Sequence, residues 1–166
     1  MPYPGITFRP ISDDDMPFLY EVFVSTRVDE LAPLGWTDEQ IDAFLRPQFH
    51  AQHTHYHAYF KGATYDLIVL DEQAIGRLYL YRTDTELRIL DIALLPSHRQ
   101  QGIGGVLLQD LLDEARAGQK TVGIYVEKFN PALRLYQRLG FREMEDTGVY
   151  YRMEWSAEAP SPAQDT

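Results

Sequence analysis

The clearest feature of the sequence is an apolar strand that stops at a proline and leads, through a glycine-rich turn, into an amphipathic helix. Residues 86–95 are strand-like, and the run ends at Pro96. From Gly102 onward apolar side chains recur at helical spacing, with polar residues on the opposite face. The apolar positions are Ile103, Val106, Leu107, Leu111, Leu112 and Ala115. This arrangement predicts a layered fold in which helices cover a sheet.

The rest of the chain supplies the other elements of such a fold. Alternating apolar residues, capping residues and turns predict strand, two helices, three strands, helix, strand, helix and two strands. The expected strands are 6–11, 66–70, 74–81, 86–95, 121–126, 141–145 and 149–155. The expected helices are 13–26, one capped by Asp38, one from Gly102, and one with Asn130 as N-cap and Pro131 as first residue; 29–37 is a loop. The fold class is therefore α/β or α+β.

Length and charge restrict the class of protein. With 166 residues the chain fits one domain, expected at 1–156, followed by a tail at 157–166 that contains Pro160 and Pro162. Fifteen basic and 25 acidic residues give a formal charge of −10, which argues against nucleic acid or an anionic membrane as partner. The absence of cysteine excludes disulfides and thiolate chemistry. No signal peptide or membrane span is evident, so a cytoplasmic location is expected.

The turn between the strand and the helix has the composition of a phosphate-binding site. Glycines allow close approach of an anion, and the first amides and the dipole of a helix attract negative charge. Arg99 adds a positive charge at the same place. The P-loop pattern is absent, and the dinucleotide fingerprint fails because Leu107 stands where its third glycine belongs.

Two segments together resemble the GNAT family of N-acetyltransferases. Residues 99–104, RQQGIG, are similar to its Arg/Gln-x-x-Gly-x-Gly/Ala pyrophosphate loop, and residues 130–141, NPALRLYQRLGF, are similar to its Asn-x-x-Ala-x-x-Leu-Tyr-x-x-x-Gly-Phe segment. The resemblance implies a mixed, mostly antiparallel sheet of about seven strands, flanked by about four helices and splayed between strands 4 and 5. It also implies direct transfer of an acetyl group from acetyl-CoA to a primary amine in a ternary complex.

The resemblance assigns the residues that bind acetyl-CoA. Backbone groups of Ile92, Ala93 and Leu94 would pair with the pantetheine arm and polarise the thioester carbonyl, as an oxyanion hole does. The pyrophosphate would lie on the amides at the start of the helix. The loop residues assigned in this way are Arg99, Gln100, Gln101, Gly102, Ile103, Gly104 and Gly105.

The same resemblance proposes catalytic residues, each beside a structural alternative. Tyr136 matches the tyrosine that protonates the departing thiolate, and this role is favoured over simple packing on its short helix. Asn130 either bonds the pantetheine arm or caps the helix. For the general base, Glu127 and Asp91 are the nearest carboxylates, while Arg88 occupies the position of the glutamate found in histone-acetylating relatives. Glu127 could instead be a solvent-facing strand end, and Asp91 a structural acid.

The region between the first strand and the hairpin supplies candidates for the acceptor pocket. They are Trp36, Phe49, Tyr56 and the histidines His50, His53, His55 and His57, with core packing as the alternative for the aromatic residues. No acidic or cysteine ligand accompanies the histidines, so no metal is expected. Arg134 and Arg138 either meet the CoA phosphates or are ordinary exposed residues.

The acceptor is expected to be a small-molecule or peptide amine, and the acidic surface favours a cationic one. Two alternatives stay open: a non-catalytic acyl-CoA-binding module, and transfer of a longer acyl group. The apolar strand from Val149 to Trp155 permits a homodimer.

Overall fold

The computed structural model describes residues 3–157 of the chain. The tail expected at 157–166 therefore lies outside the described residues except for Ala157. Among residues 3–157, no helix has both the length and the apolar composition needed to cross a membrane.

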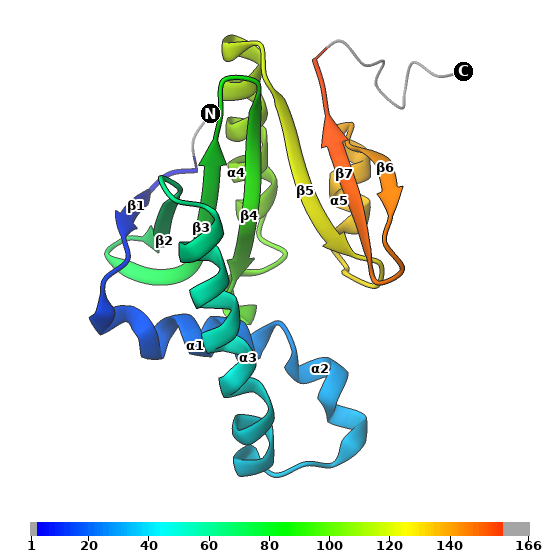
Figure 1. Cartoon of the computed structure of the whole chain (residues 1–166). Coiled ribbons are helices and arrows are strands. Elements are labelled where there is room, and N and C mark those ends of the chain that lie inside the picture. The colour runs from blue at the N-terminus through cyan, green and yellow to red at the C-terminus, as the bar shows by residue number, and fades with distance from the viewer. Residues whose placement is uncertain (1–2, 158–166) are drawn as a thin grey trace. The chain divides into compact units, whose positions relative to one another are not determined.

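Seven strands form one mixed sheet in the order β1-β2-β3-β4-β5-β7-β6 (Figure 1). The strands are β1 (Ile6–Pro10), β2 (Thr64–Leu70), β3 (Gln73–Arg82), β4 (Glu86–Leu94), β5 (Thr121–Glu127), β6 (Arg142–Asp146) and β7 (Tyr150–Trp155). The β4–β5 pair is parallel, whereas the β1–β2, β5–β7 and β6–β7 pairs are antiparallel. The sheet predicted from the sequence is thereby confirmed.

The described residues contain five α-helices, one more than expected, and three short 3-10 turns. The helices are α1 (Met16–Ser25), α2 (Val28–Leu31), α3 (Asp38–Tyr59), α4 (Ile103–Gly118) and α5 (Leu133–Leu139). The 3-10 turns are η1 (Asp13–Asp15), η2 (Ala32–Leu34) and η3 (Pro96–His98).

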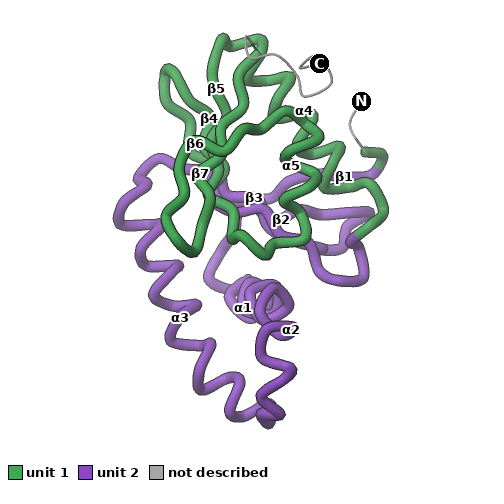
Figure 2. The backbone as a smooth tube through the Cα atoms, turned by 90° about the vertical axis from the view of Figure 1, so that its right-hand side faces the viewer, with its two compact units in different colours: residues 1–4, 80–90, 100–166 green, residues 5–79, 91–99 purple. Residues whose placement is uncertain are grey.

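The chain forms two compact units, coloured separately in Figure 2. Unit 1 comprises residues 1–4, 80–90 and 100–166, and unit 2 comprises residues 5–79 and 91–99. Strands β3 and β4 each contribute residues to both units. The single domain expected at 1–156 stays a prediction.

In unit 2, helices α1 and α3 pack through aromatic side chains. Leu19, Val22 and Phe23 of α1 are buried, and Phe23 meets Phe49 of α3 at 5.6 Å between ring centroids. Helix α3 continues through Pro47, which removes one hydrogen bond donor and strains the preceding turn. Buried side chains on both sides of the proline, Leu45 and Phe49, offset that cost by packing in the core.

In unit 1, strand β5 lies between β4 and β7. The parallel β4–β5 register begins at Glu86 and Thr121 and ends at Ile89 and Ile124, although β5 continues along β7 to Glu127. The β4–β5 pairing thus ends before either strand does, in agreement with the splay between strands 4 and 5 that the family resemblance implies. On α4 most of the apolar stripe predicted from the sequence is buried, at Ile103, Leu107, Leu111, Leu112 and Ala115, whereas Val106 is half-buried.

Local predictions are wrong in three places. Residues 29–37, expected as a loop, contain most of α2 and all of η2. Thr37, not Asp38, caps α3: its hydroxyl accepts from Gln40 N at 3.2 Å, because Thr37 is the last residue in an extended conformation. Helix α5 starts at Leu133, two residues after Pro131, because the backbone first makes a separate turn.

Candidate functional site

The end of β4 is held in unit 2 by a close approach to β3. Leu95 N donates to Ile75 O at 2.8 Å, so the pairing of the two strands extends beyond Leu94. A Cβ on Gly76 would overlap the carbonyl oxygen of Ala93 and lie 3.1 Å from Leu94 Cα. Only a glycine therefore fits at this position of β3 without displacing the backbone that the resemblance assigns to the thioester.

Asp91, one candidate base, forms an ion pair inside unit 2. Its Oδ2 accepts from Nη2 of Arg77 at 2.5 Å, and the same Nη2 donates to Gln52 Oε1 at 3.2 Å. The Arg77 side chain is only 3% exposed. Burial lowers the pKa of Arg77, but the facing Asp91 carboxylate raises it, and the net shift is upward. Asp91 thus has the structural role considered above, and its part in catalysis stays a prediction.

The turn after β4 carries Arg99, whose side chain points back into unit 2. Arg99 Nε donates to Leu94 O at 2.9 Å. Its Nη2 donates to Oγ of Ser25 at 3.2 Å and to the carbonyl oxygen of Ser25 at 3.4 Å. These acceptors belong to the protein, whereas the sequence predicts a phosphate ligand for this guanidinium.

The glycine-rich turn in unit 1 opens α4. Gln100 and Gly102 both have positive φ angles, 60° and 84°, and Gly102 is the N-cap of the helix. No atom lies within 4 Å of a Cβ built on Gly102 or Gly104, so the backbone here is open. The first amides of a helix have no partner within it, and those of Ile103 to Gly105 begin α4. This geometry suits an anion such as pyrophosphate.

Helix α5 lies beside this opening turn within unit 1. A Cβ on Gly105 would be 3.9 Å from Leu135 Cδ1, which is an ordinary contact. The next residue, Tyr136, is 4% exposed, and its ring meets the edge of Phe141 at 5.5 Å. The phenol that the resemblance assigns as general acid therefore belongs to the helix that contacts the glycine-rich turn. Its catalytic role stays a prediction.

Two further candidates lie at the ends of their elements. Asn130 Oδ1 accepts from Ala132 N at 2.8 Å, as the capping alternative expects, although the capped turn precedes α5. Glu127 is half-buried at the end of β5, and its carbonyl oxygen accepts from Asn130 N at 3.0 Å. Arg134 and Arg138 are both exposed on α5.

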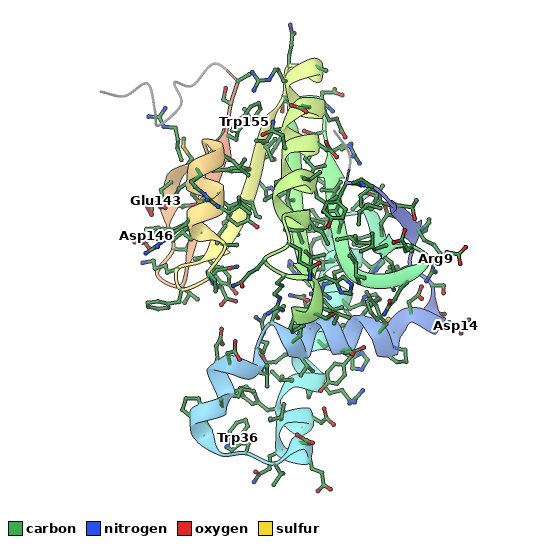
Figure 3. The ribbon with its side chains drawn as sticks, turned by 180° about the vertical axis from the view of Figure 1, so that it is seen from behind. Arg9, Asp14, Trp36, Glu143, Asp146 and Trp155 are labelled. Carbon is green, nitrogen blue, oxygen red and sulfur yellow. The ribbon has the colours of Figure 1, made fainter. Side chains whose placement is uncertain are left out.

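The acceptor-pocket candidates divide between core and surface in unit 2. Phe49 is a core residue at 2% exposure, whereas Trp36, labelled in Figure 3 in the turn before α3, packs on Phe44 at 5.2 Å. Tyr56 meets Tyr79 edge-on at 5.8 Å. The sequence gives no sign of that contact, because Tyr79 is on β3 and fully buried.

The histidines of α3 form part of an aromatic row. His53 lies 4.4 Å from His57, ring to ring. Burial lowers the pKa of His53, and His57, His50 and Arg77 lower it further against a raising effect of Asp13. The described residues hold no group of three or more His, Cys, Asp or Glu side chains arranged for a metal ion.

Comparison with known proteins identifies the family. Residues 61–143 match the model of the acetyltransferase (GNAT) domain. The chain belongs to the GNAT family. A [ribosomal protein bS18]-alanine N-acetyltransferase of Haemophilus influenzae is 29% identical over 85 residues, which are 51% of this chain and 58% of its relative. The Escherichia coli K12 protein of the same description is 37% identical over 68 residues, covering 40% and 46%. The matches thus span about half the length of these GNAT relatives.

Solved GNAT structures share the fold across most of the chain. The PaiA N-acetyltransferase of Thermoplasma acidophilum, in complex with coenzyme A, superimposes with a TM-score of 0.66 at 20% identity, over 91% of this chain and 98% of that one. A GNAT acetyltransferase of Elizabethkingia anophelis with acetyl-CoA bound gives 0.58 at 20% identity, over 93% and 99%. These likenesses extend the GNAT fold well beyond residues 61–143.

The site residues that the sequence analysis missed are Gly76 and Arg77. Gly76 did leave a signal, since a glycine inside an apolar strand often marks a close backbone approach. Arg77 left none, because its partner Asp91 is on the next strand.

Proposed function

We propose that this chain is an acetyl-CoA-dependent N-acetyltransferase that transfers acetyl directly to a primary amine. The observation that carries the proposal is the start of α4, where Gly102 and Gly104 leave the backbone open. Backbone amides at a helix start can bind a pyrophosphate without a cluster of basic side chains. Such a local site is needed because the chain as a whole has a formal charge of −10. Acetyl-CoA would supply the activated thioester and leave as the CoA thiol, while the chain binds it and handles the protons.

The residues then have separate tasks. Backbone groups of Ile92, Ala93 and Leu94 polarise the thioester carbonyl, and the amine nitrogen forms its bond to that carbon as the carbon–sulfur bond breaks. Tyr136 protonates the leaving thiolate. Either Glu127 or Asp91 accepts the proton lost by the amine. As a base, Asp91 would have to act from within its ion pair with Arg77.

We propose a peptide N-terminus as the acceptor class. The support is the description of the relatives, which names the alanine of a ribosomal protein in two cases and an N-alpha-acetyltransferase of Sulfurisphaera tokodaii in a third, 33% identical over 66 residues. The acidic charge of the chain favours basic peptides among such acceptors.

The test is a calorimetric titration of acetyl-CoA into the purified protein. The wild type should bind with a micromolar Kd, and the double variant Gly102→Glu/Gly104→Glu should lose binding because two carboxylates then occupy the open turn. Gly118→Ala, at the other end of α4, is the matched control and should bind normally. Absence of binding by the wild type would refute the proposal.

The non-catalytic alternative keeps one supporting observation, since Tyr136 is buried against Phe141 as a packing residue would be. Tyr136→Phe separates the two functions. For an enzyme, the variant keeps its affinity for acetyl-CoA and acetylates a peptide with a free N-terminal alanine about 100-fold more slowly. If the wild type binds acetyl-CoA and acetylates no amine in a broad screen, the binding-module function is favoured. Parallel titrations with longer acyl-CoAs compare their affinities with that of acetyl-CoA and so test which acyl chain length the protein prefers.

A further inference from the structure

The C-terminal end of α1 is followed by Arg27, whose guanidinium lies over the Phe23 ring at 4.7 Å from the centroid. The last turn of α1 contains no basic residue, although a helix C-terminus is stabilised by positive charge. Thr26 N and Arg27 N donate to Phe23 O and Val24 O, which satisfies two of the last carbonyl groups. The carbonyl of Ser25, the final helical residue, requires another donor.

Arg99, 74 residues further along the chain, supplies this donor. Its Nη2 reaches both the carbonyl oxygen and the hydroxyl of Ser25, at 3.4 and 3.2 Å. The hydroxyl of Ser25 in turn donates to Val22 O at 2.6 Å, so it is itself fixed to the helix. One guanidinium therefore caps the negative end of α1 from outside the helix.

The same guanidinium also holds the end of β4. Arg99 Nε donates to the carbonyl oxygen of Leu94, the last residue of the strand, at 2.9 Å. The planar guanidinium presents its donors in a fixed fork, so bonds through Nε and Nη2 fix two partners relative to one another. All of these groups, in α1, β4 and the turn after η3, belong to unit 2.

We propose that Arg99 is a positioning residue for the acceptor rather than a ligand of the CoA phosphates. It fixes the end of α1, and thereby the start of segment 26–37, which contains the acceptor-pocket candidate Trp36. This start is held against the strand whose backbone is assigned to the thioester. The effect on the acceptor rests on the proposed function, whereas the cap on α1 is a property of the protein alone. The two can therefore be tested separately.

Amide exchange tests the cap in the free protein. Arg99→Gln keeps the Arg/Gln pattern of the loop but cannot reach Leu94 and Ser25 together. We expect exchange at the amides of Thr26 and Arg27 to rise about tenfold, which corresponds to about 1.4 kcal/mol of local stability. Arg142→Gln removes an exposed arginine of β6 and is the matched control for the change in net charge. Unchanged exchange in Arg99→Gln would overturn the proposal.

A second variant guards against general unfolding. Ser25→Ala leaves Arg99 in place and removes the hydroxyl, which accepts from Arg99 and donates to Val22 O, while the carbonyl acceptor remains. Exchange at the same two amides should therefore rise by about two- to threefold. In both variants, exchange in β5 should match that of the wild type. A rise in β5 as large as that at Thr26 would indicate general loosening and would count against a local cap.

Binding and kinetics separate positioning from phosphate binding. For Arg99→Gln we expect the Kd of acetyl-CoA to stay within twofold, while the KM of a peptide with a free N-terminal alanine rises about tenfold. Arg99→Lys retains the charge without the fork, so it should behave like Arg99→Gln in this KM. A tenfold weaker Kd for acetyl-CoA with an unchanged peptide KM would assign Arg99 to the phosphates. If the wild type bound no acetyl-CoA, the proposed function would fail while the exchange result still decided the cap.

Discussion

Replacing Gly76 by alanine should damage activity more than stability. The added Cβ would overlap Ala93 O and lie 3.1 Å from Leu94 Cα, closer than an ordinary contact of 3.4–4 Å. Either the end of β4 or the facing part of β3 must therefore move, by about 1 Å at the carbonyl oxygen. Overpacking of this kind costs about 1–3 kcal/mol. For a chain of this length that lowers Tm by roughly 2–12 °C.

The larger effect is expected on the chemistry. Ala93 and Leu94 are the residues whose backbone groups we assign to the thioester, and a displacement of about 1 Å near a reacting group can cost about 100-fold. Gly76→Ala should thus lower kcat/KM about 100-fold in an assay of released CoA thiol. Gly118→Ala serves as control, because its Cβ would meet only the Lys120 side chain at 3.8 Å. Wild-type Tm and kcat/KM in Gly76→Ala would refute this account of the β3–β4 contact.

Three further substitutions test interactions within unit 2. Asp91→Ala leaves buried Arg77 without its carboxylate partner and should lower the free energy of unfolding, measured in urea, by about 3–5 kcal/mol. The double variant Asp91→Leu/Arg77→Met removes both charges and should recover much of this loss. Asp15 accepts from both Nη atoms of Arg9, at 3.0 and 2.9 Å, and this hydrogen bonding holds the pKa of Asp15 below 3.8. Its contribution is present above pH 3.8 and is lost as the pH falls through the lowered value, so Asp15→Asn should flatten the unfolding curve measured against pH below 4. Burial lowers the pKa of His53 below 6.5, so protonation favours the unfolded chain and stability falls as the pH drops below 6.5. His53→Gln should reduce this slope, and an unchanged slope in urea midpoints between pH 5 and 7.5 would contradict it.

The local part of the site could be predicted from the sequence. The periodicity after Gly102 predicted the start of α4 to within one residue, because an apolar stripe is a property of a short stretch of chain. The number of strands and the mixed, mostly antiparallel character of the sheet likewise agree with what the sequence patterns and the family resemblance predicted. Such features can be predicted because they depend on interactions between residues only a few positions apart in the sequence.

The long-range part could not be predicted. Arg99 was assigned to phosphate from its place in the loop, but its donors meet Ser25, 74 residues away. Likewise the pairing of Arg77 with Asp91 depends on the register of two strands, which no single stretch encodes. Helix α3 also continues through Pro47, because its core contacts outweigh the cost of an interior proline, and those contacts are with residues far away in the sequence. These differences share one cause. Contacts between residues far apart in the sequence decide where an arginine finds its hydrogen-bond acceptors and whether a helix tolerates an interior proline.

The net charge of the chain and the hydrogen bonds of Arg99 both favour separate roles for the amides at the start of α4 and for the Arg99 guanidinium. A protein with a formal charge of −10 repels a polyanion at long range, so binding depends on forces that act over a few ångströms. Open amides at a helix start provide such a force without a side chain. If those amides hold the phosphates, a guanidinium close to them in sequence can have another task, and Arg99 forms hydrogen bonds with Leu94 and Ser25 within unit 2. An arginine in a phosphate-binding motif can therefore serve the acceptor side of the reaction.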